Sequence, residues 1–322
     1  MKRIAVLTSG GDCPGLNACL RAVVRTAVAR RLEIFGVRRG YNGLIKNELI
    51  PLDNCSVSGM INRGGTFLHT TRSGEFETPG GIRKAAEVLA RRKIEGLIVL
   101  GGNGSLKGAS ELIPKTKTAI VGIPKSIDND VGGTDFSIGF DTALNTAVGV
   151  IDKIRDTATS HERLFFVEVM GRKRGFLALA TALAGGAEEV LLPETKTDLK
   201  ALCRRLGKGK ERGKVSSIVV VAEGDESGGA FEIARKIKKI KNYDARVSVI
   251  GHQQRGGSPS AFDRILASQF GEKAVEILIR GERNKMVGIQ KGEIVTLPLD
   301  FAWKIDKPLD PNLVNLAEIL AR

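Results

Sequence analysis

The sequence predicts a protein of the α/β class with mostly parallel sheets, divided between two domains. Short runs of branched apolar residues are each followed by a glycine-rich break and then by a helical repeat of apolar residues. Strands that alternate with helices in this way are typical of parallel sheets wound through right-handed crossovers. The length of 322 residues is more than one domain usually holds and favours two.

The first unit of this pattern is a strand over 3–8, a glycine-rich turn over 9–15 and a helix over 16–31. Apolar residues recur in this helix at spacings of three and four, which places them on one face. That face consists of Leu16, Cys19, Leu20, Val23, Val24 and Ala27. A helix with one such face is expected to pack against a sheet.

Further units follow along the chain. A strand over 97–100 leads into a turn over 101–105 and a helix that begins near Leu106, and a strand over 119–123 leads into the loop 124–130. Helical spacing then runs over 141–155 through Leu144, Val148 and Ile151. Strands are also predicted over 164–169, 217–222 and 246–250, so a second αβ series begins near residue 140.

Composition excludes several classes of protein. The hydrophobic fraction of 42% and the charged fraction of 27% are those of a folded chain rather than a disordered one. No apolar run reaches the roughly 18 residues of a membrane span, and the first residues do not have the apolar stretch of a signal peptide. The four cysteines show no metal-binding or disulfide spacing. The sequence therefore predicts a cytoplasmic protein with no membrane partner.

The net charge of +14 favours an anionic partner, and both nucleic acids and phosphorylated metabolites satisfy it. Aromatic residues make up only 5% of the chain, which leaves little material for stacking on bases. The basic run over 235–241 is typical of a solvated surface. We expect no nucleic-acid partner, and keep a nucleic-acid binder as an alternative.

Loops at the predicted strand ends carry the candidate chemistry. SGGDCPG at 9–15 and GGNGS at 101–105 offer open backbone N–H groups at helix starts, where anions bind, although each also fits a tight turn. PKSIDND at 124–130 places Asp128 and Asp130 beside Lys125 and Ser126, a group that can activate a hydroxyl and hold Mg²⁺. MGRKRG at 170–175 and GHQQRGG at 251–257 add arginines suited to phosphate. Because the carboxyl ends of parallel strands meet at one edge, these loops together indicate a phosphoryl-transfer site.

These motifs resemble the 6-phosphofructokinase family, in its short bacterial type. The matching segments are TSGGD at 8–12, INRGGTFL at 61–68, GGNGS at 101–105, PKSIDND at 124–130, VMGRKRG at 169–175 and GHQQRGGSP at 251–259. The resemblance implies two Rossmann-like three-layer αβα domains and a homotetramer. It implies transfer of the γ-phosphoryl group of ATP, with Mg²⁺, to the 1-hydroxyl of fructose 6-phosphate, giving fructose 1,6-bisphosphate. The implied donor domain covers 1–138 plus 251–303, and the sugar-phosphate domain covers 139–250 plus 304–322.

The resemblance also implies roles for individual residues. Asp128 matches the general base and Asp130 a residue that supports the base and the metal, while Arg172 and the Gly11 N–H match groups that stabilise the transferring phosphoryl. The complete implied catalytic set is Asp128, Arg172, Gly11, Ser126 and Asp130. The implied nucleotide site is Gly11, Arg72, Ser73, Gly102, Asn103, Gly104 and Ser105, with Asn103 and Asp130 at the metal. The implied sugar-phosphate site is Ser126, Asp128, Arg163, Met170, Gly171, Arg172, Glu223, Arg246, His252 and Arg255, in which Arg163 and Arg246 come from a neighbouring subunit.

An effector site for ADP or phosphoenolpyruvate at a subunit interface is implied as well. The matching residues are Arg21, Arg25, Arg155, Glu188, Arg212 and Lys214. Asn54 and Gly59 stand where the family commonly has an arginine and an aspartate. The loss of a fixed guanidinium is expected to weaken anion binding, so we expect reduced or altered allosteric control.

Two positions depart from the ATP-dependent pattern. Asn103 stands where the family commonly has a metal-binding aspartate, so we expect weaker Mg²⁺ binding. Lys125 stands where ATP-dependent members have glycine and pyrophosphate-dependent members have lysine. Gly104 stands where pyrophosphate users have aspartate, and it leaves room for the α-phosphate of ATP. We expect ATP as the donor, with pyrophosphate as the alternative and a catalytically weak sensor of nucleotides or sugar phosphates as a more distant one.

Overall fold

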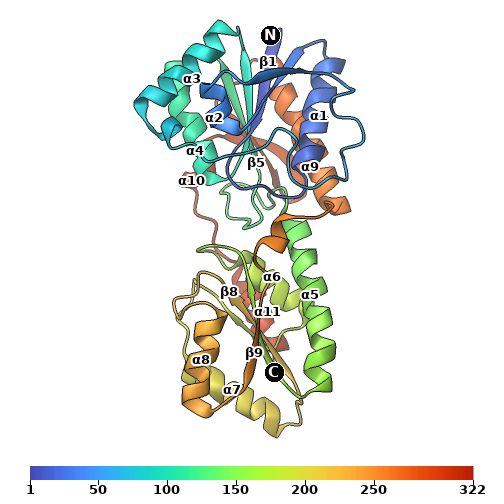
Figure 1. The fold of residues 1–322 in the computed structure, drawn as a ribbon, viewed down its shortest axis with the longest axis vertical. Helices are drawn as coiled ribbons and strands as arrows, with labels where there is room; N and C mark the ends of the chain where they lie inside the picture. Colours follow the sequence, from blue (N-terminus) through green and yellow to red (C-terminus); the bar gives the residue numbers. More distant parts are fainter. Residues whose placement is uncertain (322) are drawn as a thin grey trace. The chain divides into compact units, whose positions relative to one another are not determined.

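The computed structural model describes residues 1–321 and divides the chain into two compact units (Figure 1). The first unit is Met1–Thr142 with Arg255–Lys307, and the second is Ala143–Gln254 with the residues from Pro308 onward. The chain therefore crosses between the units after Thr142, Gln254 and Lys307. The sequence-based boundaries after residues 138, 250 and 303 each fall four residues before these crossings.

The first unit is built on a seven-stranded sheet with the strand order β11-β10-β5-β4-β1-β2-β3. The strands of the centre run parallel, and β3 and β11 pair antiparallel at the two edges. The bounds are β1 (Arg3–Thr8), β2 (Glu33–Val37), β3 (Leu49–Leu52), β4 (Gly96–Gly101), β5 (Ala119–Pro124), β10 (Lys285–Gln290) and β11 (Glu293–Pro298). β4 and β5 are buried along their whole length, which explains why both read as uninterrupted apolar runs.

Helices cover both faces of this sheet (Figure 1). On one face lie α1 (Leu16–Ala29) and α9 (Ala261–Ile279), which pack so closely that a Cβ at Gly271 would lie 2.8 Å from the Cys19 carbonyl oxygen. On the other face lie α2 (Gly40–Ile45), α3 (Pro79–Arg91) and α4 (Asn103–Leu112), and α10 (Phe301–Lys304) follows β11. Short 3₁₀ helices span Glu75–Glu77 (η1), Ile113–Lys115 (η2) and Gly251–Arg255 (η3). The apolar face expected for α1 is confirmed, because all six of its members are buried.

The second unit has a four-stranded parallel sheet with the order β7-β8-β6-β9. Its strands are β6 (Leu164–Val169), β7 (Glu189–Leu191), β8 (Ser217–Ala222) and β9 (Ala245–Val249). One face packs on α5 (Phe140–Ser160), α6 (Phe176–Gly185) and α11 (Pro311–Leu320), and the other on α7 (Leu199–Glu211) and α8 (Ala230–Lys241). Residues alternate between the two cores along each strand, as Val219 and Val220 do on β8.

The predicted α/β class with mostly parallel sheets is confirmed. One boundary was wrong, because α4 begins at Asn103 rather than near Leu106, so the last three residues of GGNGS form its first turn. The sequence analysis also missed five strands, of which β2 and β10 lie inside the first sheet and β3, β7 and β11 lie at sheet edges. The edge strands are short or of mixed burial, so they carry little periodic signal. Within the part of the chain that is described, none of the helices is both long and apolar enough to cross a bilayer.

Candidate functional site

The loop between β1 and α1 exposes backbone rather than side chains. Gly10 and Gly15 adopt left-handed conformations, with φ of +83° and +101°, and Gly15 is the residue before the first turn of α1. A Cβ at Gly11 would lie 2.4 Å from Nη1 of Arg255, so a larger residue there would displace that guanidinium. Thr70 fixes the loop by donating to the Gly10 carbonyl at 2.7 Å. The result is an open backbone at a helix start, which suits a phosphate.

The second glycine-rich loop leads into α4 and is tied to the first. Gly102 caps this helix without a side-chain hydrogen bond, and the position of a Cβ at Gly104 is clear of other atoms to 4 Å. The Ser105 hydroxyl donates to the Ser9 hydroxyl at 3.0 Å, and the Tyr41 hydroxyl donates to the Ser105 carbonyl at 2.7 Å. Two glycine-rich backbones, each at the start of a helix, are therefore held side by side.

The third loop, 124–130, carries the carboxylates and continues from β5, next to β4 in the sheet. The Lys125 ammonium is buried and donates to the Gly11 carbonyl, which joins this loop to the first one. Ser126 accepts from the Asp128 backbone N–H at 3.2 Å and donates to Oδ1 of Asp130 at 2.9 Å. Only 3% of Asp128 is exposed. The candidate base, the candidate metal ligand and the glycine-rich loops thus occupy one edge of the first sheet.

The donor atoms around Asp130 fit a magnesium ion. Asn103 uses its amide NH₂ to donate to the backbone carbonyl of Asp130 at 3.1 Å and to its Oδ2 at 3.3 Å. The other amide atom, Oδ1 of Asn103, is buried and has no hydrogen-bond partner among the described residues. A buried oxygen without a partner is costly unless something else satisfies it. Mg²⁺ takes one or two protein oxygens and completes its shell with water and substrate phosphates, so an ion fits here.

Arg72 and Ser73 lie on the segment that leads into η1, and Arg255 lies beside the β1–α1 loop. Arg72 is exposed, and the Ser73 hydroxyl accepts from the Phe76 N–H at 3.3 Å at the start of η1. Arg255, which the sequence analysis places in the sugar-phosphate site, belongs to the first unit and donates to the Asp12 carbonyl at 3.2 Å. This contact places its guanidinium beside the β1–α1 loop.

Four other candidate residues come together in the second unit, at the carboxyl ends of β6 and β8. The Met170 N–H donates to Oε1 of Gln254 at 2.8 Å, and the Arg172 N–H donates to Oε1 of Glu223 at 2.7 Å. Gly171 and Arg172 have positive φ values of +147° and +54°. This tight turn lets Met170, Gly171, Arg172 and Glu223 share one strand-end cluster.

Arg163 and Arg246 lie at the other end of the same strands. Arg163 precedes β6, and Arg246 pairs with Phe165 near the start of β6. The six residues of β6 separate Arg163 from Met170, a distance of roughly 20 Å, and Arg246, level with Phe165, lies roughly 16 Å along the strands from Met170. His252 is exposed on η3, beyond the end of β9. The two arginines thus do not join the strand-end cluster of their own chain.

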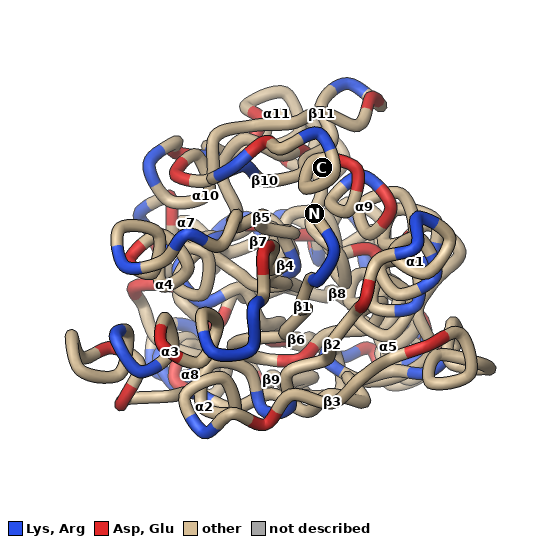
Figure 2. Tube along the Cα trace, turned by 90° about the horizontal axis from the view of Figure 1, so that it is seen from above, with Lys and Arg blue, Asp and Glu red and all other residues tan. Residues whose placement is uncertain are grey.

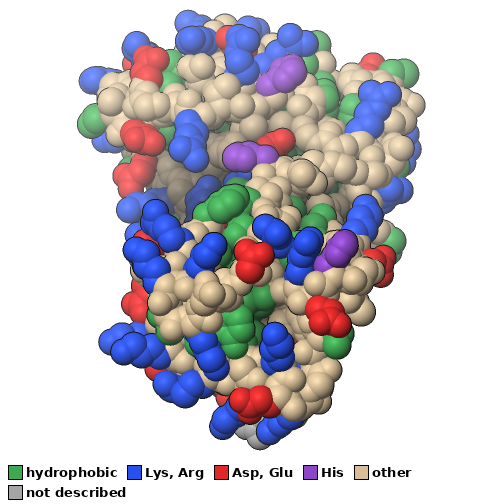
Figure 3. Space-filling model, turned by 60° about the horizontal axis from the view of Figure 1, so that its bottom comes forward, with side chains coloured by type: hydrophobic (Ala, Val, Ile, Leu, Met, Phe, Trp, Pro, Cys, Tyr) green, Lys and Arg blue, Asp and Glu red, His purple; other side chains and the backbone are tan. Residues whose placement is uncertain are grey.

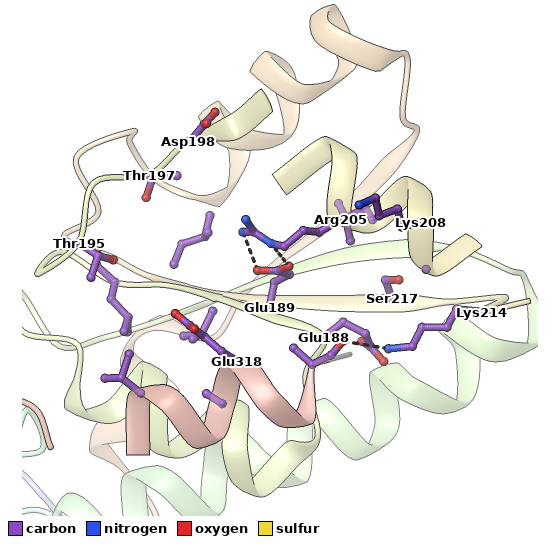
Figure 4. A pocket seen from close by; sticks show the side chains of 18 of the residues that line it. Glu188, Glu189, Thr195, Thr197, Asp198, Arg205, Lys208, Lys214, Ser217 and Glu318 are labelled. Atoms are coloured by element: carbon purple, nitrogen blue, oxygen red, sulfur yellow. Dashed lines mark hydrogen bonds and ion pairs between the residues drawn. The ribbon is translucent and has the colours of Figure 1, made fainter. Parts of the chain in front are cut away.

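A cavity of about 670 Å³ in the second unit contains part of the expected effector site (Figure 4). α7, β7 and α11 contribute to its walls, and Glu188, Arg212 and Lys214 line it. Arg155 joins this group by pairing with Glu188 at 3.5 Å and by donating to the carbonyls that end α6, at 2.8 and 2.6 Å. The other two expected residues, Arg21 and Arg25, lie on α1 of the first unit.

Burial keeps two side chains of the first unit uncharged, Cys13 on the β1–α1 loop and Tyr41 on α2. It raises the pKa of the Cys13 thiol to about 12, and this thiol donates to the Ile138 carbonyl at 3.2 Å. Burial also raises the pKa of Tyr41, which stacks on Phe76 with ring centroids 3.8 Å apart. A phenol that stays protonated keeps its hydrogen bond to Ser105, and Tyr41 is a supporting residue that the sequence analysis missed. Its segment, 38–45, carries neither a motif nor a clear period.

Basic side chains do not form one continuous patch on the face that Figure 3 shows. Lys and Arg are interspersed with Asp and Glu along the chain, and acidic and uncharged side chains separate them on the face shown in Figure 3 (Figures 2 and 3). Lys238, Lys239 and Lys241 in the last turn of α8 are all exposed, as expected for a solvated run. The absence of a nucleic-acid partner stays a prediction.

The sequence is similar to those of known phosphofructokinases over most or all of its length. A family model described as Phosphofructokinase matches residues 3–278. The protein named ATP-dependent 6-phosphofructokinase from Clostridium botulinum strain Loch Maree (type A3) is 48% identical over 322 residues, which cover both chains completely. The protein of the same name from strain Eklund 17B (type B) is 49% identical over 323 residues, again over the whole of both chains.

Solved structures extend the likeness to the fold. A phosphofructokinase of Pichia pastoris in the T-state matches 94% of this chain at a TM-score of 0.87 and 35% identity, and that of Saccharomyces cerevisiae matches 100% at 0.88 and 35%. This chain spans only 35% of the Pichia chain and 48% of the Saccharomyces chain. A pyrophosphate-dependent phosphofructokinase from Marinobacter aquaeolei, at 24% identity and a TM-score of 0.85, shares the fold.

Proposed function

We infer that this chain, which belongs to the phosphofructokinase family, transfers the γ-phosphoryl group of ATP to the 1-hydroxyl of fructose 6-phosphate, giving fructose 1,6-bisphosphate. The main support for this reaction is that the loops over 9–15, 101–105 and 124–130 meet in the first unit. There a buried carboxylate, Asp128, lies on a loop whose Lys125 ammonium holds the Gly11 backbone. ATP and sugar phosphates are soluble metabolites, so we place the enzyme in the cytoplasm.

In the proposed mechanism, Asp128 takes the proton of the sugar hydroxyl as its oxygen attacks the γ-phosphorus. The bond from that phosphorus to the β–γ bridging oxygen breaks, and ADP leaves with the electron pair. Charge on the migrating group is spread over its oxygens, so positioned cations and N–H groups supply most of the rate. We assign this stabilisation to the Gly11 N–H, to Lys125 and to Arg172. Asn103 and Asp130 would hold Mg²⁺, which neutralises the phosphate charge when bound.

A coupled assay of ADP release with fructose 6-phosphate tests the proposal. We expect Asp128→Asn to lower kcat by at least about 10³-fold, because the hydroxyl then loses its proton acceptor. Asp152→Asn, an exposed aspartate of α5, is the matched control and is expected to keep the parental rate. Parental activity in Asp128→Asn would reject the assigned base. A chain without turnover would instead favour the weak sensor of nucleotides or sugar phosphates.

The space at Gly104 supports ATP as the donor. No atom lies within 4 Å of the position of a Cβ at Gly104, in the exposed first turn of α4, and we propose that the nucleotide beyond the β-phosphate occupies this open space. We expect Gly104→Asp to weaken the use of ATP, since a carboxylate there repels the α-phosphate. The same variant is expected to change turnover with pyrophosphate less. Equal losses with both donors would contradict this reading of Gly104.

Pyrophosphate remains the second candidate donor because Lys125 lies beside the phosphate-binding backbone. A lysine there can neutralise either donor. Parallel assays of the parental chain with ATP and with pyrophosphate at equal Mg²⁺ decide between the two. Turnover only with pyrophosphate would overturn the proposed donor.

The metal site is proposed to bind Mg²⁺ weakly, because the amide oxygen of Asn103 carries no charge. Asn103→Asp is expected to lower the Mg²⁺ concentration that gives half-maximal rate. Mn²⁺ binding followed by electron paramagnetic resonance gives a readout that does not depend on turnover. Identical metal affinity in both proteins would contradict the hypothesis.

The placement of Arg163 and Arg246 supports a homotetramer. They lie roughly 20 Å (Arg163) and roughly 16 Å (Arg246) along the strands from Met170 in the strand-end cluster of their own chain, so we assign them to the 6-phosphate of another subunit. We propose that Arg163 and Arg246 of one subunit bind the 6-phosphate together with His252 and Arg255 of a neighbouring subunit. Arg246→Ala is expected to raise the KM for fructose 6-phosphate, while Arg204→Ala, exposed on α7, leaves it unchanged. Sedimentation of the parental chain as a monomer at assay concentration would refute the assembly.

We also propose that the cavity with Glu188, Arg212 and Lys214 binds a weakly acting anionic effector such as ADP or phosphoenolpyruvate. Arg155 is already engaged with Glu188 and with the end of α6, so it organises the cavity wall rather than lying open to a ligand. We expect fructose 6-phosphate saturation curves that ADP shifts only slightly. Strongly sigmoidal curves relieved by ADP would show that allosteric control is intact.

A further inference from the structure

Asn129 stands between the two carboxylates of the loop 124–130, and its role is not explained by the reaction scheme. Its backbone is left-handed, with φ of +52°, and only 4% of its surface is exposed. Asparagine tolerates this conformation better than most residues, and an exposed turn would need nothing more from it. A buried primary amide, however, must have its hydrogen bonds satisfied. Asn129 therefore serves the turn through its backbone conformation and also needs hydrogen-bond partners for its buried side chain.

The amide of Asn129 joins this loop to the following one. Its Nδ2 donates to the Asp135 carbonyl at 3.0 Å, and its Oδ1 accepts from the Ser137 N–H at 3.0 Å. The Ser137 hydroxyl returns to the first loop by donating to the Ser126 carbonyl at 2.6 Å. The Asn129 side chain, in the middle of the 126–130 turn, thus binds the neighbouring segment at two points, Asp135 and Ser137.

That neighbouring segment is itself fixed to the sheet. The Asp135 N–H donates to the Ile289 carbonyl at 2.8 Å, and its Oδ2 accepts from the Lys291 N–H at 2.7 Å. Lys307 donates to the same Asp135 carbonyl that receives Asn129, at 2.9 Å. The partner of Asn129 is therefore anchored to the β10–β11 hairpin, so a displacement of Asn129 would not be followed by its partner.

The two carboxylates depend on Asn129 to different degrees. Asp130 has supports of its own, from the Ser126 hydroxyl and the Asn103 amide. Asp128 directly precedes Asn129, so the left-handed turn at 129 sets the peptide plane that joins them. We propose that Asn129 is a positioning residue for Asp128, which holds the base within reach of the sugar hydroxyl. This inference rests on the proposed function.

The first test is Asn129→Gly, which keeps the left-handed backbone accessible and removes the amide. We expect kcat to fall about 10²-fold, because an error of about 1 Å in the base position costs that much. The KM for ATP is expected to change less than about threefold, since other loops bind the donor. The matched control is Asn284→Gly, which replaces an exposed, left-handed asparagine of the same unit with φ of +57°. It is expected to keep the parental kcat.

A double-mutant cycle separates positioning from general loosening. In Asp128→Asn the base is already gone, so adding Asn129→Gly is expected to lower the residual single-turnover rate by less than about threefold. A loss of about 10²-fold in both backgrounds would overturn the proposal. If Asn129 had a merely structural role, the effects of Asn129→Gly and Asp128→Asn on the rate would be independent and would multiply. Parental kcat in Asn129→Gly would overturn it as well.

A second variant covers the case in which Asn129→Gly does not fold, as judged by circular dichroism. Ser137→Ala keeps the N–H that Asn129 accepts from and removes the hydroxyl, which bonds the Ser126 carbonyl at 2.6 Å and Oδ1 of Asn129 at 3.2 Å. We expect a loss in kcat of about tenfold that disappears in the Asp128→Asn background. The same loss in both backgrounds would refute the positioning role.

The outcomes also separate this inference from the proposed function. If the parental chain does not phosphorylate fructose 6-phosphate, the proposed function fails. If the parent is active and Asp128→Asn is not, while Asn129→Gly and Ser137→Ala keep the parental kcat, only the role of Asn129 fails.

Discussion

Adding one methyl group at Gly11 should damage the reaction far more than the fold. The Cβ of Gly11→Ala would lie 2.4 Å from Nη1 of Arg255 and 3.2 Å from its Cζ. The backbone of Gly11 is not among the left-handed positions, so alanine itself is tolerated there. An ordinary contact needs about 3.4 Å or more, so the guanidinium has to retreat by about 1 Å. The contact of Arg255 with the Asp12 carbonyl, now 3.2 Å, then breaks.

The magnitudes follow from what is lost. Arg255 is half-buried and its far end can move, so the free energy of unfolding should fall by only about 1 kcal/mol, the value of one hydrogen bond. In the reaction, a shift of about 1 Å in Arg255, which we propose binds the 6-phosphate, is expected to lower kcat/KM for fructose 6-phosphate by about 10²-fold. Urea unfolding and steady-state kinetics on the same preparation measure both quantities.

Two companion variants sharpen the test. Gly149→Ala, in the middle of α5 with no atom near the added Cβ, is the control, and should keep its activity while gaining up to about 1 kcal/mol of stability. In an Arg255→Ala background the clash no longer exists, so Gly11→Ala should cost little more. Full activity of Gly11→Ala, or an undiminished loss when Arg255 is absent, would refute the reasoning.

Three further variants test the packing of the first unit. Asp263→Ala leaves three buried donors without their acceptor, so chemical denaturation should show a loss of about 3 kcal/mol or more; a change below about 1 kcal/mol would contradict this. Burial lowers the pKa of Lys307 from its ordinary 10.5 to about 8. Between these two pH values, the Lys307 ammonium is therefore more fully protonated in the unfolded chain than in the folded one. The free energy of unfolding should therefore rise by up to about 3 kcal/mol as pH increases through that window, and Lys307→Met should lose this rise in a pH series of urea titrations. Tyr41→Phe keeps the aromatic stack but loses the bond to α4, so thermal or urea unfolding should report a loss of about 1 kcal/mol, and an unchanged stability would show that the hydroxyl is not needed.

Hydrophobic periodicity was enough to predict β1 with α1, a unit in which the strand is buried and the helix has one apolar face. β1 and α1 appear within two residues of their predicted ends, because burial of that face is what stabilises them. The start of α4 was wrong for the opposite reason. Glycine and asparagine are poor helix formers, and its first turn is held by contacts that Asn103 and Ser105 make with other loops.

The candidate site shows the same division. The sequence by itself determined which loops carry glycines, carboxylates and arginines, because those motifs are continuous in the chain. Only the tertiary structure decided that Arg255 contacts Asp12, that Tyr41 supports α4 and that Asn129 is fastened to Asp135 beside the β10–β11 hairpin. Arg255 and Asp12 are 243 residues apart in the chain. Hydrogen bonds between distant segments depend on how the strands are ordered in the sheet, and no local pattern of residue types records that order.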